Sequence, residues 1–275
     1  FAVSGMGWSP KNFTIEWCRQ NGVDLIPGDG YLPATVPGVV GAWAAAVSRF
    51  GTMSFSQILQ PVIELAENGY PVYQRMHDRL EQFSERFRSL YPTTAAIYLP
   101  DGKVPEVGQI IRNPDFGKSM RIMCDAEDAA KSQGRVAGIE AARDAFYKGP
   151  IAKRIAEFIR ENPVMDASGE AHAGLLSEED MAEWEATIEQ PVTYEYKGLD
   201  VYKCPPWTQG PVFLQQLAIL KGFDLQDQGH NTTEYLHTVV ESAKLAFADR
   251  DTYYGDPLFD ETPLGMLLSE DYSVG

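Results

Sequence analysis

Apolar residues spaced three and four positions apart recur along most of this chain, and this spacing constrains its fold more than any other feature. In residues 39–50, Val40, Trp43, Val47 and Phe50 fall on one face of a helix with 3.6 residues per turn. The same period predicts further helices over residues 13–21, 54–69, 73–90, most of 113–161, 177–184, 210–221 and from about 232 onward. We therefore expect a mainly α fold.

Capping residues and breakers set the expected ends of these helices. Ser54 is placed to cap one helix, and Ser177 with Asp180 resembles a capping box in which aspartate replaces the usual glutamate. Pro61 predicts a kink or a late start in the helix over 54–69, because proline has no N–H to donate.

The clearest β pattern is a run of alternating β-branched and aromatic residues over 192–204. Lys197-Gly198 interrupts this run at its middle, which predicts a two-stranded hairpin. Asp101-Gly102 predicts a second, shorter hairpin over 98–103. The expected layout is thus mainly helical over 13–190, a small β-hairpin over 192–204, and helices over 210–252.

The acidic composition excludes some classes of partner. The chain has 39 acidic and 23 basic residues, a formal net charge of −16, so its surface would repel phosphate backbones and anionic membranes. The longest nearly apolar run, residues 39–47, is far below the roughly 20 residues that a membrane helix needs. We expect neither a nucleic-acid nor a membrane partner. The chain opens with Phe1 and has no basic or apolar leader, so we expect it to be cut from a longer precursor.

The cysteines and histidines do not predict a metal site. Three separated cysteines without a C-x-x-C pattern favour three buried thiols. His230 and His237 lie seven positions apart and lack the spacing and the glutamate of a zinc-protease helix, so polar or capping roles are favoured. Asp249-Arg250-Asp251 is either a catalytic acid cluster or, the favoured interpretation, an ion-pair network at a helix end. No cofactor is expected.

Several segments, taken in order, resemble the large subunit of γ-glutamyltransferases, a branch of the N-terminal-nucleophile hydrolases. They run colinearly from about residue 4 to 260 and include Ala34-Thr-Val-Pro-Gly-Val-Val-Gly-Ala-Trp43, Pro61-Val-Ile-Glu-Leu-Ala-Glu-Asn-Gly-Tyr-Pro-Val72, Ala145-Phe-Tyr-Lys-Gly-Pro-Ile-Ala152, Gly174-Leu-Leu-Ser-Glu-Glu-Asp180 and Ala246-Phe-Ala-Asp-Arg250. Each segment alone is weakly specific, whereas the ordered set is specific.

The resemblance implies a two-subunit amide hydrolase or acyltransferase. Members of this family are made as a precursor that cleaves itself before a threonine, which then attacks a γ-glutamyl amide with its own amine as the base. This chain would be an incomplete large subunit whose partner is the small subunit of the same precursor. The two subunits would build an αββα sandwich, with the helices over 210–252 packing toward the small subunit. Since the threonine is expected beyond residue 275, no catalytic residue is assigned within this chain.

One departure from the family pattern concerns the acyl group. The family places an arginine in a short motif ending in Ala-Pro, where it binds the α-carboxylate of the substrate. If Pro10 matches that proline, the arginine position falls on Met6 or, with a gap, near Trp8. Met6 and Trp8 would suit a less polar acyl group, as in cephalosporin-acylase-like relatives. The alternative is a shifted alignment, with the carboxylate-binding residue supplied elsewhere.

A second departure lies in residues 205–210, where Trp207, Gln209 and Gly210 stand in a loop that usually carries small residues in the family. Trp207 would line an acyl or acceptor pocket, or it would be a subunit-interface tryptophan; both remain open. The predicted substrate-binding residues are therefore Met6, Trp8, Trp207, Gln209 and Gly210.

The resemblance predicts a self-processing amide hydrolase, and two alternatives stay open. One is an acylase or amidase of the same family without γ-glutamyl specificity. The other is an uncleaved, inactive structural relative. The compartment, exported or cytoplasmic, is left open.

Overall fold

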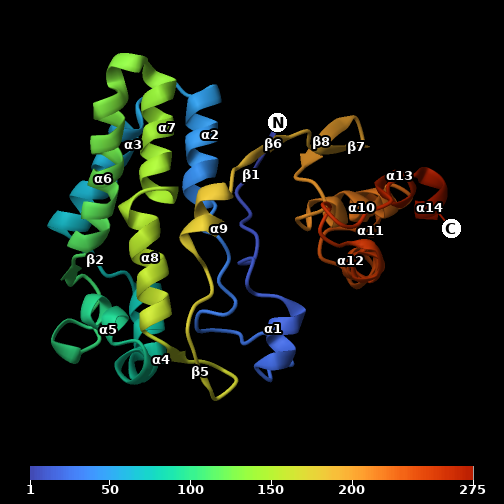
Figure 1. Ribbon diagram of the computed structural model, residues 1–275. Coiled ribbons are helices and arrows are strands. Elements are labelled where there is room, and N and C mark those ends of the chain that lie inside the picture. The colour runs from blue at the N-terminus through green and yellow to red at the C-terminus, as the bar shows by residue number, and fades with distance from the viewer. Residues whose placement is uncertain (275) are drawn as a thin grey trace. The chain divides into compact units, whose positions relative to one another are not determined.

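The computed structural model describes residues 1–274 and confirms a mainly α fold with few, short strands (Figure 1). The chain divides into two compact units. Unit 2 is Gly5–Thr187, and unit 1 combines Phe1–Ser4 with the residues from Ile188 onward.

Unit 2 holds the first nine α-helices. They are α1 (Ile15–Gln20), α2 (Val39–Phe50), α3 (Phe55–Asn68), α4 (Gln74–Leu90), α5 (Pro92–Tyr98), α6 (Pro114–Ala130), α7 (Arg135–Tyr147), α8 (Pro150–Glu161) and α9 (Glu178–Glu183). Helix α7 packs between α2 and α6, and α3 packs on α6 (Figure 1). Ile139 and Ala142 of α7 and Met123 of α6 are completely buried. These side chains belong to one continuous apolar core, which is drawn from six of the nine helices and from the segments between them.

The start of α3 is stabilised from two directions. Ser54 and Gln57 form a capping box, as the N-cap position of Ser54 predicts. The buried carboxylate of Glu127 in α6 also accepts hydrogen bonds from the N–H groups of Phe55 and Ser56, at 2.7 and 2.6 Å. Helix α3 therefore begins at Phe55 and continues through Pro61. The predicted late start is wrong, because the first turn is already fixed before the proline is reached.

The short hairpin predicted over 98–103 is also wrong. Residues 92–98 form α5, with Pro92 in its first turn, and a 3₁₀ turn (Pro100–Gly102) follows directly. Asp101 and Gly102 do adopt the positive φ angles, 54° and 72°, on which the prediction rested. Leu99, which precedes that turn, is buried, so the flanking residues pack into the unit instead of pairing as strands.

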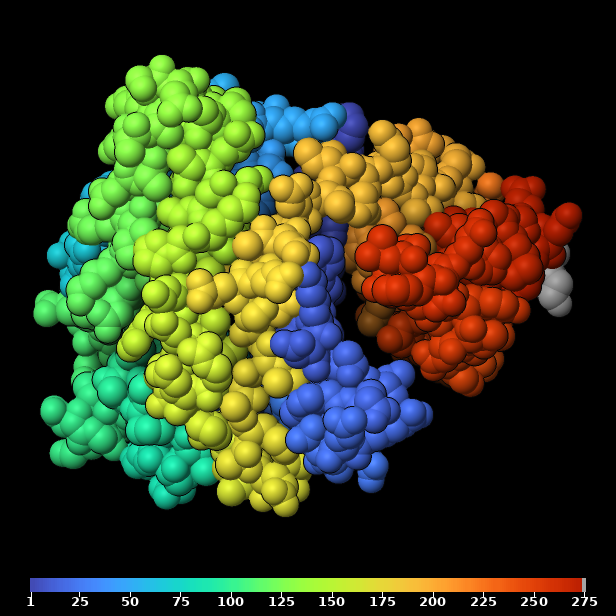
Figure 2. Space-filling model, in the orientation of Figure 1, coloured from blue at the N-terminus to red at the C-terminus, as the bar shows by residue number. Residues whose placement is uncertain are grey.

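Two very short antiparallel pairs in unit 2 were not predicted. β2 (Tyr70–Pro71) pairs with β3 (Ile110–Ile111), and β4 (Val164–Met165) pairs with β5 (Ala171–His172). Figure 2 shows the α1 segment, in blue, lying against the β4–β5 hairpin, in yellow. The ring centroid of Trp17 in α1 is 6.5 Å from that of His172.

Unit 1 contains the predicted hairpin over 192–204. β7 (Val192–Tyr196) and β8 (Leu199–Lys203) pair antiparallel, with Thr193 opposite Tyr202 and Glu195 opposite Asp200. Lys197 and Gly198 both have positive φ, as a two-residue hairpin turn requires. A further short strand, β1 (Ala2–Ser4), is hydrogen-bonded to β6 (Thr187–Glu189).

The remaining helices follow the β7–β8 hairpin. They are α10 (Gly210–Leu220), α11 (Leu225–Gln228), α12 (Thr233–Tyr253), α13 (Leu264–Leu267) and α14 (Glu270–Val274). Helix α10 packs against α12 and the hairpin. Helix α12 buries only Ser242 and Ala246, and much of its apolar stripe stays exposed.

Two other predictions concern thiols and membrane helices. Cys18, Cys124 and Cys204 are free thiols. The sequence predicted that they are buried, but all three are only half-buried. Within residues 1–274, no helix combines the length and the apolar character that crossing a bilayer requires.

Candidate functional site

Residues Gly5–Lys11, which include the predicted site residues Met6 and Trp8, form an extended segment whose backbone is held at three points. The indole Nε1 of Trp184 donates to the carbonyl oxygen of Met6 at 3.1 Å. The N–H of Val36 donates to the carbonyl oxygen of Trp8 at 3.0 Å. The N–H of Lys11 donates to Oδ1 of Asp180 at 3.0 Å.

Glycine allows this segment to approach its neighbours closely. A Cβ on Gly7 would overlap the backbone carbonyl of Val36, and a Cβ on Gly38 would overlap the carbonyl of Gly5 and the ring of Trp184. These two positions have no room for a side chain, so the sequence here is dictated by packing of backbone on backbone.

The side chains of Met6 and Trp8 remain accessible although their backbone is fixed. Met6 is 59% exposed and Trp8 is 42% exposed. Two large apolar side chains on a fixed backbone can form a wall against which an apolar ligand packs. We call Met6 and Trp8 the acyl wall, after the substrate group that the sequence predicts for them.

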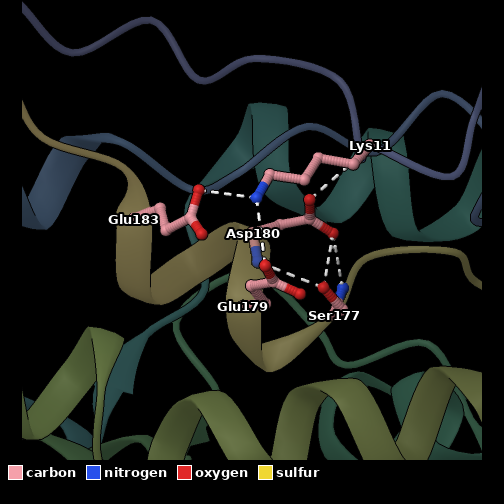
Figure 3. Close-up of polar contacts among 5 residues, drawn as sticks. All are labelled: Lys11, Ser177, Glu179, Asp180 and Glu183. Atoms are coloured by element: carbon pink, nitrogen blue, oxygen red, sulfur yellow. Dashed lines mark hydrogen bonds and ion pairs between the residues drawn. The ribbon is translucent and has the colours of Figure 1, made fainter.

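Asp180 is fully buried and connects α9 to this segment (Figure 3). Its Oδ2 accepts from the N–H of Ser177 at 2.9 Å and from the Ser177 hydroxyl at 2.7 Å, while its own N–H donates to that hydroxyl oxygen at 3.1 Å. Burial raises the pKa of Asp180, but the hydrogen bonds from Lys11 and Ser177 outweigh it, so the pKa lies below its usual value. The predicted capping box is confirmed, whereas the bond to Lys11 was not foreseen.

The ammonium of Lys11 turns toward α9. It forms ion pairs with Glu183 at 2.6 Å and with Glu179 at 3.2 Å (Figure 3). The hydrogen bond to Glu183 raises the pKa of Lys11. Lys11 carries the only cationic side chain before Arg19, and it is already engaged by two carboxylates.

A cleft of about 460 Å³ lies beside the segment, and sequence reasoning did not find it. Its lining includes Ser9, which directly follows Trp8, and apolar side chains of Phe13, Ile15 and Val23. Arg19 also lines the cleft. Within residues 1–274 its guanidinium has neither an ion-pair nor a hydrogen-bond partner.

The other three predicted site residues lie together in unit 1, at the start of α10. Gln209 is exposed and occupies the N-cap position. Gly210 is buried, and its N–H donates to Oγ1 of Thr208 at 3.0 Å. Trp207 is half-buried, and its Nε1 donates to Glu189 at 2.6 Å. Thus only Gln209 is freely accessible, while part of the Trp207 ring remains exposed.

Of the ion-pair network predicted at Asp249-Arg250-Asp251, the structure contains one ion pair. Arg250 pairs with Asp251 at 3.2 Å, and Asp249 accepts from the hydroxyl of Tyr272 at 2.9 Å and from the amide of Gln215. Asp249 thus connects α12 to α10 and α14, whereas Asp251 pairs with its neighbour on α12.

Two of the histidines have polar partners. Nδ1 of His77 lies 2.8 Å from the carbonyl oxygen of Pro105, and Nδ1 of His172 lies 2.7 Å from Asp166. Among the residues that the structure describes, no cluster of three or more potential metal ligands occurs.

Comparison with protein families gives one match over nearly the whole chain. A family model described as Gamma-glutamyltranspeptidase matches residues 2–274. The glutathione hydrolase-like YwrD proenzyme of Bacillus subtilis (strain 168) is 33% identical over 273 residues, which cover 98% of this chain and 46% of that protein. The chain therefore spans about half the length of this curated relative.

Solved structures agree with this match. The structure of LmbA2991HD has a TM-score of 0.92 and 38% identity, covering 99% of this chain and 46% of the other. The cephalosporin acylase from Bacillus halodurans has a TM-score of 0.82 and 28% identity, covering 99% of this chain and 47% of the other.

Proposed function

The chain belongs to the gamma-glutamyltranspeptidase family, and from that premise we propose that it is the large-subunit part of a self-processing amide hydrolase or acyltransferase. The small subunit of the same precursor would supply the threonine nucleophile. Its hydroxyl oxygen attacks the carbonyl carbon of the amide, its proton passes to the threonine amine, and the amide nitrogen leaves with that proton. The acyl group then passes to water or to an amino acid. The proenzyme relative and the coverage of about half its length support this division.

Unit 1 would contact the small subunit through α10 and α12, as one outer layer of an αββα sandwich. Four large apolar side chains on these helices support this role, because they are between 38% and 52% exposed: Phe213, Leu236, Val240 and Phe247. Exposed apolar side chains gathered on two neighbouring helices are typical of a surface that another chain covers.

The acyl group of the substrate would be apolar. The observation that carries this proposal is the acyl wall. If Pro10 matches the proline of the family motif, the position of the carboxylate-binding arginine falls on Met6 or, with a gap, near Trp8. Neither side chain can pair with a carboxylate, and Lys11 is occupied by Glu179 and Glu183. An aliphatic chain against the wall gains about 25 cal/mol for each Å² of apolar surface buried. An acylase or amidase is therefore the favoured member of the family.

One observation favours γ-glutamyl substrates instead. Arg19 lines the cleft that begins at Ser9, and its guanidinium has no partner among the residues that the structure describes. If a substrate carboxylate binds there, the large subunit keeps γ-glutamyl recognition with an arginine at a different position.

Hydrolysis of two anilides by the full-length purified product tests this choice. We expect a higher kcat/KM for an aliphatic acyl anilide than for the γ-glutamyl anilide. The Met6→Arg variant should show a smaller difference in kcat/KM between the two anilides, because a guanidinium replaces part of the apolar wall. A γ-glutamyl preference that is lost in Arg19→Gln would favour the second candidate. A product that remains uncleaved and hydrolyses neither anilide would leave the inactive structural relative.

A further inference from the structure

Two hydrogen bonds from α9 and its C-cap hold residues Gly5–Lys11, the segment that carries the acyl wall. They involve two side chains four positions apart in the sequence. Asp180 and Trp184 lie on the same side of the turn, as residues at i and i+4 do. Trp184 binds the carbonyl of Met6 and Asp180 binds the N–H of Lys11, so their contacts flank Trp8 on both sides.

The C-terminal end of α9 is itself fixed to the core of unit 2. Trp184 is 5% exposed, and its ring centroid lies 5.5 Å from that of Tyr147 in α7. The Tyr147 hydroxyl donates to the carbonyl of Pro37 at 2.7 Å and accepts from the N–H of Gly41 at 2.9 Å. A continuous set of packed groups thus connects the core to the backbone of Met6.

We propose that Asp180 and Trp184 are positioning residues that hold the acyl wall in place and so determine which acyl groups are accepted. This inference rests on the proposed function of the acyl wall. Neither residue is expected to touch the substrate, since both are buried behind the segment (Figure 3 shows Asp180 and its contact with Lys11).

The expected consequence is a loss of selectivity for long acyl chains. The test compares hexanoyl with acetyl substrates because only the hexanoyl chain carries methylene groups that can bury apolar surface against Met6 and Trp8. Releasing the segment lets the two side chains move, so the long substrate loses contacts and the short one does not. A fault in folding would lower the activity toward both substrates equally, because it lowers the amount of active enzyme.

The test uses the full-length protein and two matched comparisons. Asp180→Ala removes the bond to Lys11 as well as the capping box, whereas Ser177→Ala weakens the capping box and leaves the bond to Lys11. Trp184→Phe removes the N–H that Met6 accepts and keeps an aromatic ring in the core. Asp180→Asn keeps an oxygen that can accept from Lys11 but places its NH2 group opposite the Ser177 N–H, so it disturbs the capping box while keeping the bond to Lys11.

We expect the ratio of kcat/KM for hexanoyl anilide to that for acetyl anilide to fall about fivefold in Asp180→Ala and in Trp184→Phe, mainly through the KM for hexanoyl anilide. Ser177→Ala and Asp180→Asn should stay close to the wild-type ratio. An active wild type whose ratio is unchanged in Asp180→Ala and Trp184→Phe would overturn the inference, and so would an equal loss toward both substrates.

Hydrogen exchange of the Lys11 amide separates this inference from the proposed function. Exchange should be faster in Asp180→Ala than in Ser177→Ala, because only the first loses the acceptor of that N–H. If the wild type hydrolyses neither anilide, the proposed function fails. Faster exchange of the Lys11 amide in Asp180→Ala would still show that Asp180 holds residues Gly5–Lys11 in place. Equal exchange in both variants would contradict the positioning role directly.

Discussion

The two units of this chain differ in the size of their apolar cores. In unit 2, Phe55, Met123 and Ile139 are no more than 1% exposed and belong to one continuous core. In unit 1, the long helix α12 leaves Leu236 and Val240 about half exposed. Unit 2 thus has one continuous core from its own residues, although Trp43 and Leu65 also stay about half exposed. Unit 1 keeps on α12 an apolar face that suits an interface. Substitutions in the core of unit 2 should therefore affect stability, whereas substitutions on α12 of unit 1 should affect assembly.

The largest effect should come from the core of unit 2. Ile63 and Ile58 lie on the same helix, α3, but Ile63 is 1% exposed and Ile58 is 38% exposed. Ile63→Ala should lower the free energy of unfolding by about 2–5 kcal/mol, through lost burial and the cavity left behind. Ile58→Ala is the matched control and should cost less than about 1 kcal/mol. Equal losses, measured by denaturant unfolding, would refute the assignment of the buried face.

A buried carboxylate in the same unit should give the next largest effect. Glu127→Ala leaves the N–H groups of Phe55 and Ser56 without their acceptor at the start of α3. We expect a loss of about 2–3 kcal/mol, typical of hydrogen bonds to a charged group. The neighbouring Asp128 is exposed, so Asp128→Ala should change the midpoint of unfolding very little. A small effect of Glu127→Ala would mean that the capping box alone fixes this helix end.

Two tyrosines allow the units to be compared directly. The Tyr147 hydroxyl in unit 2 forms two hydrogen bonds, while the buried Tyr254 hydroxyl in unit 1 has no partner among residues 1–274. Tyr147→Phe should cost about 1–2 kcal/mol, and Tyr254→Phe should be neutral or slightly stabilising. Thermal unfolding of both variants checks this, and a large loss in Tyr254→Phe would point to an unrecognised partner.

The same tyrosines predict how stability depends on alkaline pH. Burial raises the pKa of Tyr147 and of Tyr254 to about 12, above the value of about 10 in an unfolded chain. Their contribution is therefore complete below pH 10 and is lost as the pH rises from about 10 to about 12, because the unfolded chain ionises first. Tyr147→Phe should make this decline shallower. An unchanged pH profile would show that Tyr147 ionises equally in both states.

A substitution on the exposed face of α12 should have the smallest effect on stability. It should instead change the association of the two subunits. Val240→Asp at an exposed position should alter the free energy of unfolding of this chain by less than about 0.5 kcal/mol. In the full-length protein it should weaken the association of the two subunits, because it places a charge in an apolar contact. Thr233→Asp adds the same charge at an exposed polar position and is the control. Unchanged sedimentation of Val240→Asp would show that this face is not the interface.

Most helices and their ends could be predicted because their signals are local. Ser54, Ser177 and the turn at Lys197-Gly198 act within three or four residues, and the structure confirms all three. The two-residue strands β2–β5 and the turn after Leu99 could not be predicted. β2 pairs with β3 about 40 positions away, and two-residue strands, including the local pair β4–β5, are too short to show an alternating pattern.

The candidate site was predictable only in part. The exposure of Met6 and Trp8 fits their assignment to the site, which came from the resemblance. The second contact of Asp180 was hidden, because its bond to Lys11 spans 169 positions of the sequence and the residue already had a local role as a cap. Whether the five assigned residues touch a substrate stays a prediction.

Self-cleavage of the precursor is tested most directly by the intact mass of the full-length purified product, together with N-terminal sequencing of any smaller fragment. We predict two fragments, one of which contains this chain while the smaller begins with threonine. A single uncleaved chain under native conditions would contradict the proposed function and leave a helical protein that only resembles an enzyme subunit.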